Sequence, residues 1–386
     1  MVPLSSESSY DVIVVGAGPA GSASASLFAE QGRRVLLVDA ARFPRSKPCA
    51  EYVSPGGVAI LQRLGALARI EAAGTFRWLR GMQLRAPNGG RHLIEYSADD
   101  GRQKQGLSVP RLVMDAALLE VARARGVEVR EGFRVRDVWR ADGRVRGVNG
   151  PQGERVAAEL VIGADGLHSV VARALKARRP APWPRRLGLV SHWANVDWPE
   201  DFGCLLVGPR GYVGIAPLDH AGQVSIGLVR GMPRGRQGAS AAALEAGLAE
   251  YPDLRGRLRQ GRLAGPVQGV GPLATRVRAS AGPGYRLVGD AAGFFDPFTG
   301  EGIFRALRSA ELVAACPDAY ARARTRAFST RARLVALIQV FVQTPRLMDF
   351  AVQRLQRRPH VAQELGNVLG DLAPARLDLA WRLLGP

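Results

Sequence analysis

The chain has 386 residues, of which 47% are hydrophobic and 23% are charged. This composition excludes a disordered chain, a collagen and a coiled coil, and is typical of a globular protein with one large or two smaller cores. The 53 basic and 34 acidic residues give a net charge of +19, but all except three of the basic residues are arginines. Together with the high glycine and alanine content, this preference indicates a genomic base-composition bias rather than selection for a nucleic-acid partner.

Cysteine use and hydropathy indicate a cytoplasmic protein. Cys49, Cys204 and Cys316 are too few for a disulfide framework and lack the spacing of a zinc or redox site, so no metal is expected. The N-terminus has no basic segment followed by an apolar core, so no leader is expected. The longest apolar run, residues 334–342, is about half of the ~18 residues that a membrane span needs. Arginines flank this run, so a peripheral membrane contact of the helix around residues 331–346 is an alternative to ordinary packing.

The first elements in chain order are a strand, a helix and a second strand. Residues 10–15 form an apolar run that leads into a glycine cluster, and residues 20–31 have the small side chains of a closely packed helix. Residues 34–38 form another apolar run that ends at Asp39. This order predicts a parallel sheet.

The rest of the chain mixes helical and strand patterns. We expect short buried strands at residues 160–162 and 285–288, and period-two runs over residues 187–229 predict an antiparallel sheet. The other expected elements are a helix at 107–125, a strand over 127–140 that pairs through a turn at 141–143 with residues 144–150, a helix at 239–251, and Arg-rich helices over 303–386.

The glycine cluster has the pattern of a dinucleotide-binding loop. Gly16 permits the turn, Gly18 lets the backbone approach a pyrophosphate, and Gly21 allows close packing of the helix. The helix start offers free N–H groups and a positive dipole end. Asp39 can bind both ribose hydroxyls and disfavours a 2′-phosphate, which leaves NAD or FAD. The expected cofactor-binding positions in this segment are Gly16, Gly18, Pro19, Ala20, Gly21 and Asp39.

Two later segments resemble motifs of the flavoprotein monooxygenase and geranylgeranyl reductase superfamily. Gly-Ala-Asp-Gly at residues 163–166 resembles its Asp-Gly motif, and Gly-Asp-Ala-Ala at 289–292, followed by Asp-Pro-Phe-Thr-Gly-Glu-Gly at 296–302, resembles its second FAD motif. The resemblance implies that FAD is the cofactor. Asp290 is expected to bind a ribitol hydroxyl, and the helix after residue 302 to direct its N–H groups at the flavin. The cofactor positions in these segments are Asp165, Gly166, Gly289, Asp290, Pro297, Gly300 and Gly302.

A further cofactor contact is expected from Arg111. Residues 111–115 resemble the Arg-x-x-x-Asp segment of the superfamily, whose arginine reaches the cofactor. The alternative is a surface arginine paired with Asp115, the acid four residues later.

The loop after the second strand supplies candidates for the substrate side. Lys-Pro-Cys at residues 47–49 resembles a stretch of geranylgeranyl reductases, but residues 50–52 are Ala-Glu-Tyr where those enzymes usually have glycines. The loop is expected to cover the flavin, with Cys49 and Tyr52 facing the substrate. Cys49 is either a small buried hydrophobe or a redox or positioning residue. His192 on a predicted strand is either a packed residue or a base.

Residues 211–218 define the expected floor of the cavity. They stand where geranylgeranyl reductases have Tyr-x-Trp-x-Phe-Pro and flavin halogenases have Trp-x-Trp-x-Ile-Pro, but both bulky positions are small, Gly214 and Ala216. The missing aromatics and the absence of a nearby lysine argue against a halogenase. Because Tyr212, Gly214 and Ala216 alternate along one strand, they share a face. We expect a wide cavity there that admits an aromatic or polyketide-like ring.

These observations predict an α/β fold, in which a Rossmann-like FAD-binding domain (GR2 type) is interrupted by an antiparallel-sheet substrate domain and followed by C-terminal helices. The FAD-binding domain is expected at residues 1–78, 106–182 and 272–315. The substrate domain is expected at 79–105 and 183–271, and the C-terminal helical region at 316–386.

The resemblance implies an FAD-dependent oxidoreductase that is reduced by NADH or NADPH and acts on a small hydrophobic or aromatic substrate. Gly214 and Ala216 favour a monooxygenase that hydroxylates an aromatic or lipophilic substrate with O2. The Lys-Pro-Cys stretch favours the alternative, an enzyme that reduces isoprenoid double bonds. A non-catalytic basic protein that binds membranes or nucleic acid is a more distant alternative, since no basic motif is interleaved with aromatic residues.

Overall fold

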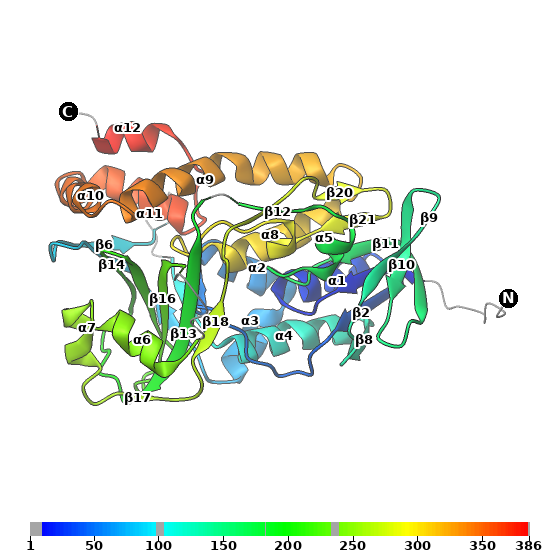
Figure 1. Cartoon of the computed structure of the whole chain (residues 1–386), viewed down its shortest axis with the longest axis horizontal. Helices are drawn as coiled ribbons and strands as arrows, with labels where there is room; N and C mark the ends of the chain where they lie inside the picture. Colours follow the sequence, from blue (N-terminus) through cyan, green and yellow to red (C-terminus); the bar gives the residue numbers. More distant parts are fainter. Residues whose placement is uncertain (1–9, 98–103, 182, 233–238, 385–386) are drawn as a thin grey trace.

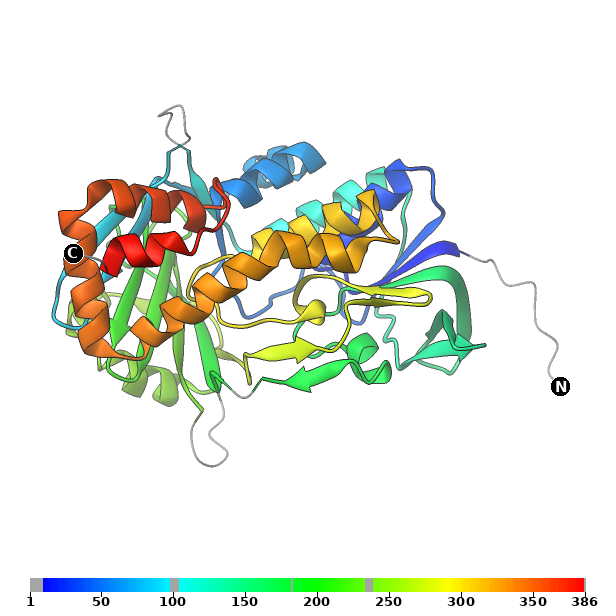
Figure 2. The same ribbon diagram turned by 90° about the horizontal axis from the view of Figure 1, so that it is seen from above.

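The computed structural model describes residues 10–97, 104–181, 183–232 and 239–384. Residues 1–9, where no leader is expected, lie outside the described residues. Residue 182, the expected domain boundary, also lies outside them. Figures 1 and 2 show two sheets side by side along the long axis, with one long C-terminal helix across both and the last helices beside the second sheet.

A mainly parallel sheet forms the half of the molecule from which the N-terminus emerges (Figure 1). Its strand order is β20-β21-β11-β1-β2-β8, and β1 pairs in parallel with both β11 and β2. The predicted β-α-β start is therefore present. The strands are β1 (Tyr10–Val15), β2 (Val35–Asp39), β8 (Glu128–Glu131), β11 (Arg155–Gly163), β20 (Ala281–Gly282) and β21 (Tyr285–Leu287).

Both faces of this sheet are covered, which explains why its central strands are continuously apolar. Helices α1 (Pro19–Glu30), α4 (Arg111–Ala124) and α8 (Gly302–Ala315) pack on one face. The hairpin of β9 (Asp137–Ala141) and β10 (Arg144–Asn149), together with α5 (Val170–Ala174), packs on the other.

The second sheet has the order β17-β13-β16-β15-β14-β5-β6 and is antiparallel except where β14 pairs with β5. Helices α6 (Ala241–Leu248) and α7 (Pro252–Arg257) lie beside one face, where they share a core with the sheet. The other face is turned towards a cavity between the two sheets. The strands are β5 (Gly81–Arg85), β6 (Arg91–Glu95), β13 (Arg186–Ala194), β14 (Phe202–Gly208), β15 (Gly211–Pro217), β16 (Val224–Gly231) and β17 (Arg262–Leu263), with β18 (Gln268–Val270) paired to β13.

The C-terminal helices connect the two halves. Helix α9 (Tyr320–Val342) runs from the parallel sheet to the second sheet (Figure 2), and α10 (Pro345–Arg357), α11 (Pro359–Leu369) and α12 (Asp378–Leu384) follow it. The expected helix around residues 331–346 is not continuous, because α9 ends at Val342 and α10 begins at Pro345 after a bend of 113°. Among the described residues no single helix has the length and hydropathy of a membrane span, although the bent pair of α9 and α10 meets that test by length and composition.

Two local predictions differ from the structure. Residues 127–140 were expected to form one strand, but β8 pairs with β2 in the parallel sheet whereas β9 pairs with β10. The expected helix at 107–125 begins only at Arg111, since β7 (Gly106–Ser108) precedes it and Pro110 is its N-cap. The predicted hairpin turn at residues 141–143 is present.

The remaining elements are short. They are β3 (Tyr52–Val53), α2 (Pro55–Leu64), α3 (Ala66–Ala72), β4 (Arg77–Leu79), β12 (Arg178–Pro180), β19 (Thr275–Val277) and the 3-10 turn η1 (Gly289–Ala292).

Candidate functional site

The glycine cluster forms a tight crossing between β1 and α1. Gly16 has a φ of +100°, and a Cβ on Gly21 would lie 1.7 Å from the carbonyl oxygen of Gly16, so neither position accommodates a side chain. The carboxylate of Asp39, at the end of β2, accepts the N–H of Ala17 at 2.7 Å. Gly18, Pro19 and Ala20 line the cavity, whereas Gly16 and Gly21 hold the backbone behind it.

The loops before α8 form the adjoining wall. The residues predicted to bind the cofactor there, Gly289, Asp290, Pro297, Gly300 and Gly302, all line the cavity. Burial raises the pKa of the Asp290 carboxyl, and the nearby positive charge of Lys47 opposes this effect. Lys47, from the Lys-Pro-Cys stretch, itself lines the cavity.

Of the two residues of the Asp-Gly motif, only Gly166 is among those that line the cavity. The carboxylate of Asp165 accepts the hydroxyl of Ser169 at 2.5 Å and the N–H of Val170 at 2.6 Å. Asp165 thus caps α5 and fixes the turn that presents Gly166 to the cavity.

Arg111 is buried rather than a surface residue. Its guanidinium forms two hydrogen bonds with the Asp115 carboxylate, at 2.9 and 2.8 Å, and Arg45 approaches the same carboxylate at 3.2 Å. Arg111 also lines the cavity. The expected pair with Asp115 is therefore present, but it holds the arginine at the cavity wall and not at the surface; the cofactor contact stays a prediction.

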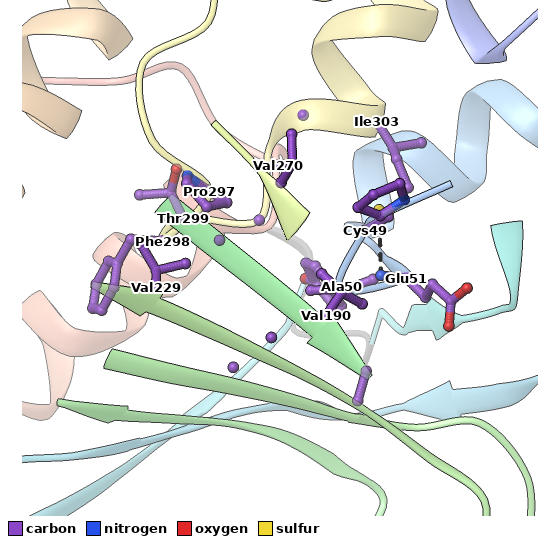
Figure 3. A pocket seen from close by; sticks show the side chains of 18 of the residues that line it. Cys49, Ala50, Glu51, Val190, Val229, Val270, Pro297, Phe298, Thr299 and Ile303 are labelled. Carbon is purple, nitrogen blue, oxygen red and sulfur yellow. Dashed lines mark hydrogen bonds between the residues drawn. The ribbon is translucent and has the colours of Figure 1, made fainter. Parts of the chain in front are cut away.

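The loop of residues 49–52 crosses the cavity between the two sheets (Figure 3). Its Glu51 is buried, with the side chain pointing away from the side on which Val229 and Phe298 lie. The Glu51 carboxylate accepts the N–H of Arg111 at 2.9 Å and contacts Nε2 of His192 at 2.7 Å. This hydrogen bond raises the pKa of His192. His192 thus holds the loop and is not among the residues lining the cavity.

Cys49 and Tyr52 line the cavity on either side of Glu51. The Cys49 sulfur accepts the N–H of Glu51 at 3.3 Å, and the Tyr52 hydroxyl donates to that of Tyr96 at 2.6 Å. Burial raises the pKa of both Cys49 and Tyr52. Neither Glu51 nor Tyr96 was predictable as a site residue from the sequence, where the only signal for Glu51 is a carboxylate at a position that is usually glycine in geranylgeranyl reductases.

The floor of the cavity is open at the expected positions. Tyr212, Gly214 and Ala216 line it, and Gly214 is paired with Gly227 on β16. A Cβ on Gly214 would meet only the Leu205 side chain, at 3.6 Å. Substantial space therefore remains above this pair of glycines.

Tyr212 closes one end of the floor through a buried polar cluster. Its hydroxyl donates to Asp296 at 2.6 Å, its ring meets that of Phe298 edge-on at 4.9 Å, and Arg186 forms an ion pair with Asp296 at 3.1 Å. Gln339 of α9 donates to the same carboxylate at 2.8 Å. The cluster fixes the Tyr212 ring and ties the floor to the C-terminal helices.

The cavity has a volume of about 260 Å³, and its two sides differ in chemistry. One side consists of backbone at the dinucleotide-binding motifs, where a Cβ on Gly18 or Gly302 would meet nothing closer than 3.5 Å. In the same wall, the buried Thr299 hydroxyl has no hydrogen-bond partner among the described residues. An open glycine cradle, an unpartnered hydroxyl and a helix N-terminus fit the phosphates and flavin of FAD.

Comparison with known proteins agrees with this fit. A family model described as an FAD binding domain matches residues 9–246. A menaquinone reductase of Mycolicibacterium smegmatis is 31% identical, covering 97% of this chain and 96% of its own length. A digeranylgeranylglycerophospholipid reductase of Methanothrix thermoacetophila is 32% identical, covering 78% of this chain and 75% of its own.

Solved structures show the same fold. The flavin-dependent brominase Bmp2 superposes with a TM-score of 0.82 at 23% identity, covering 94% of both chains. A flavoprotein/dehydrogenase from Cytophaga hutchinsonii has a TM-score of 0.82 at 21% identity, covering 94% of this chain and 92% of its own. The expected α/β fold and family resemblance are therefore confirmed. Because the family model covers more than half of the sequence and the first relative is matched over nearly its whole length, this chain belongs to the FAD-binding domain family and is an FAD-dependent oxidoreductase.

Proposed function

We propose that this enzyme reduces carbon–carbon double bonds in the isoprenoid chain of a lipid, with NADH or NADPH as the reductant. The observation that carries the proposal is the apolar wall opposite the dinucleotide-binding motifs. There the second sheet directs aliphatic side chains into the cavity, among them Leu84, Val190, Leu205 and Val229. The two named relatives support it as well, since menaquinone and digeranylgeranylglycerophospholipid share an unsaturated isoprenoid chain.

The residues of this chain have two tasks in such a reaction. FAD, when bound, supplies the hydride chemistry. The cavity walls hold the chain of the substrate and exclude water. Reduction of a double bond also needs one proton, and Cys49 and Tyr52 are the candidates to deliver it, because both line the cavity. Burial raises the pKa of each, so both carry a proton at neutral pH but are weak acids.

A monooxygenase is the second candidate, and the open floor favours it. Gly214, Ala216 and Gly227 leave space where a planar ring could lie. In that case NAD(P)H and O2 would be consumed together and one oxygen atom would enter the product.

Gly214→Trp separates the two candidates, because the new ring would occupy this space. We expect the variant to retain reduction of geranylgeranyl substrates within a few-fold, since geranylgeranyl reductases carry tryptophan at the resembling position. The product should gain two hydrogens, with one NAD(P)H consumed per double bond and no O2 uptake. Gly231→Trp is the matched control, because Gly231 lies on β16 outside the cavity and a Cβ there meets nothing within 4 Å.

The opposite result identifies the monooxygenase. Wild-type protein would then consume O2 with a ring substrate and incorporate one oxygen atom, and Gly214→Trp would abolish this turnover. FAD affinity should stay nearly unchanged in both cases, because the cofactor motifs lie in the other wall.

A further inference from the structure

The bend between α9 and α10 exposes apolar side chains that the catalytic cavity does not use. Val340 is 45% exposed, Leu347 38% and Phe350 40%. Leu347 and Phe350 are three residues apart on α10 and therefore share a face of that helix. Isolated exposed apolar residues are ordinary, but several at one bend form a candidate contact surface.

Trp183 lies at the same bend. Its indole N–H donates to the Gln343 side chain at 3.1 Å, its ring lies 5.8 Å from that of Phe295, and the residue is 39% exposed. Val340 is three residues before Gln343 and shares its face of α9. We call Trp183, Val340, Leu347 and Phe350 the elbow patch. An exposed tryptophan beside aliphatic residues is typical of a surface at a membrane interface.

A basic cavity adjoins the elbow patch through the Trp183 segment. Ala181, Pro184 and Arg185, on either side of Trp183 in the chain, line a second cavity of about 710 Å³. The charged side chains that line it are Arg173, Lys176, Arg178 and Arg185, and its lining contains no carboxylate. Among the described residues none of these four cations forms an ion pair, whereas the buried Arg111, Arg186 and Arg331 are all paired. Unpaired cations beside exposed apolar groups complement an anionic lipid surface.

We propose that the elbow patch and the basic cavity together dock this enzyme on an anionic phospholipid bilayer. The apolar side chains would enter the acyl boundary while the four cations face lipid phosphates. On the inner side of the same bend, Phe341 and Val342 pack in one core with Phe294 and Phe298, which line the catalytic cavity. Docking would therefore bring the wall of the catalytic cavity close to the membrane.

Co-sedimentation of the FAD-loaded full chain with vesicles tests the proposal. Binding to vesicles of phosphatidylcholine and phosphatidylglycerol should be strong at ~0.05 M salt and fall steeply by ~0.5 M, because screening shortens the Debye length. Leu347→Glu with Phe350→Glu, and separately Lys176→Glu with Arg178→Glu, should each weaken binding at least tenfold. Each variant should keep its FAD absorbance and thermal midpoint, since all four side chains lie outside the catalytic cavity.

Matched controls come from the opposite side of the molecule, where α3 and α4 lie (Figure 1). Leu112→Glu changes a residue that is 44% exposed on α4, and Arg69→Glu reverses an exposed charge on α3. Both should bind vesicles like the wild type. Equal losses in controls and test variants would show only a diffuse effect of net charge and would overturn the proposal.

Fluorescence gives a second measurement that does not depend on activity. Brominated acyl chains should quench the tryptophan emission of wild-type protein on vesicles, and Trp183→Phe should remove much of this quenching. Absence of vesicle binding at low salt would overturn the proposal. So would variants at Lys176 and Arg178 that raise the KM for NAD(P)H while vesicle binding stays unchanged, because the basic cavity would then be a nucleotide site.

Discussion

Glu51 has a φ of 58°, a left-handed conformation that usually selects glycine. A buried carboxylate at such a position needs compensation, and Glu51 obtains it from the N–H of Arg111 and from His192. Arg111 begins α4 beneath the parallel sheet, and His192 lies on β13 of the second sheet. One side chain therefore fixes the loop that carries Cys49 to both halves of the enzyme.

The His192 titration tests this contact. The hydrogen bond to Glu51 raises the pKa of His192, so its ring should titrate above the usual 6.5 by NMR. The folded state then holds a proton that the unfolded chain has lost, and this contribution to stability is present below pH ~6.5 and disappears as pH rises through the folded pKa. Glu51→Gln should lower the His192 pKa. An unchanged His192 titration in that variant would show that the pair does not form.

Asp290 is the residue on which we expect FAD affinity to depend strongly. It lines the cavity at a buried turn, and the sequence motif assigns it to a ribitol hydroxyl. Asp290→Ala should cost about 1.5–3 kcal/mol of binding free energy, the range for a hydrogen bond to a charged group, or about 10- to 150-fold in Kd. Calorimetric titration of the FAD-free protein measures this loss. Asp290→Asn keeps an oxygen acceptor and should lose less, and equal affinity in Asp290→Ala would refute the assignment.

At the scale of elements, the close packing of α1 against the end of β1 requires glycine at position 21. A Cβ on Gly21 would overlap the carbonyl oxygen of Gly16, so Gly21→Ala must push α1 away from the sheet. We expect the free energy of unfolding to fall by about 1–3 kcal/mol, the usual cost of overpacking, and FAD to bind more weakly. Chemical denaturation measures the stability. Gly256→Ala on exposed α7 is the control and should be neutral or slightly stabilising, because its Cβ meets nothing within 4 Å.

The elements show what the sequence can and cannot predict. The β1-α1-β2 unit was predictable because its glycines, apolar runs and terminal acid each have one structural explanation. The division of residues 127–140 between β8 and β9 was not, since alternation predicts a strand but not its partner. Likewise, the pairing register that sets Gly214 opposite Gly227 cannot be read from a strand pattern, and the contact of Tyr52 with Tyr96 joins segments that are distant in the chain. The cofactor motifs are local and could be read, whereas the substrate wall depends on tertiary packing.

For the whole molecule, a buried ionic cluster fastens the C-terminal helices to the rest. Arg331 of α9 pairs with Asp371 at 2.8 Å and with Glu301 at 3.4 Å, next to the start of α8. The Ser54 hydroxyl, at the N-cap of α2, donates to Asp371 at 2.5 Å. These contacts join α2, α8 and α9 to the segment after α11, so their strength should affect the stability of the whole molecule.

The pH dependence of stability tests this cluster. Burial raises the pKa of Asp371 from 3.8 to about 7, although the charge of Arg331 opposes the effect. Between these two values the folded state keeps a proton that the unfolded chain releases, so the free energy of unfolding should fall as pH rises from about 4 to 7. Asp371→Asn cannot titrate and tolerates the φ of 59° at this position, so its stability should fall less over the same range.

Denaturant unfolding at several pH values measures how the free energy of unfolding depends on pH, both for the wild type and for Asp371→Asn. Asp142→Asn is the matched control, because Asp142 also has a positive φ, 51°, but its side chain is 87% exposed. Asp142→Asn should show the same dependence of the free energy of unfolding on pH as the wild type.

Asp371→Asn could also show the wild-type dependence on pH. Asp371 would then be ionised throughout this range, and its ion pair with Arg331 would outweigh the cost of burying both charges. In that case Asp371→Ala should destabilise the protein most at neutral pH, since it would remove the nearer of the two carboxylates with which the buried Arg331 pairs among the described residues.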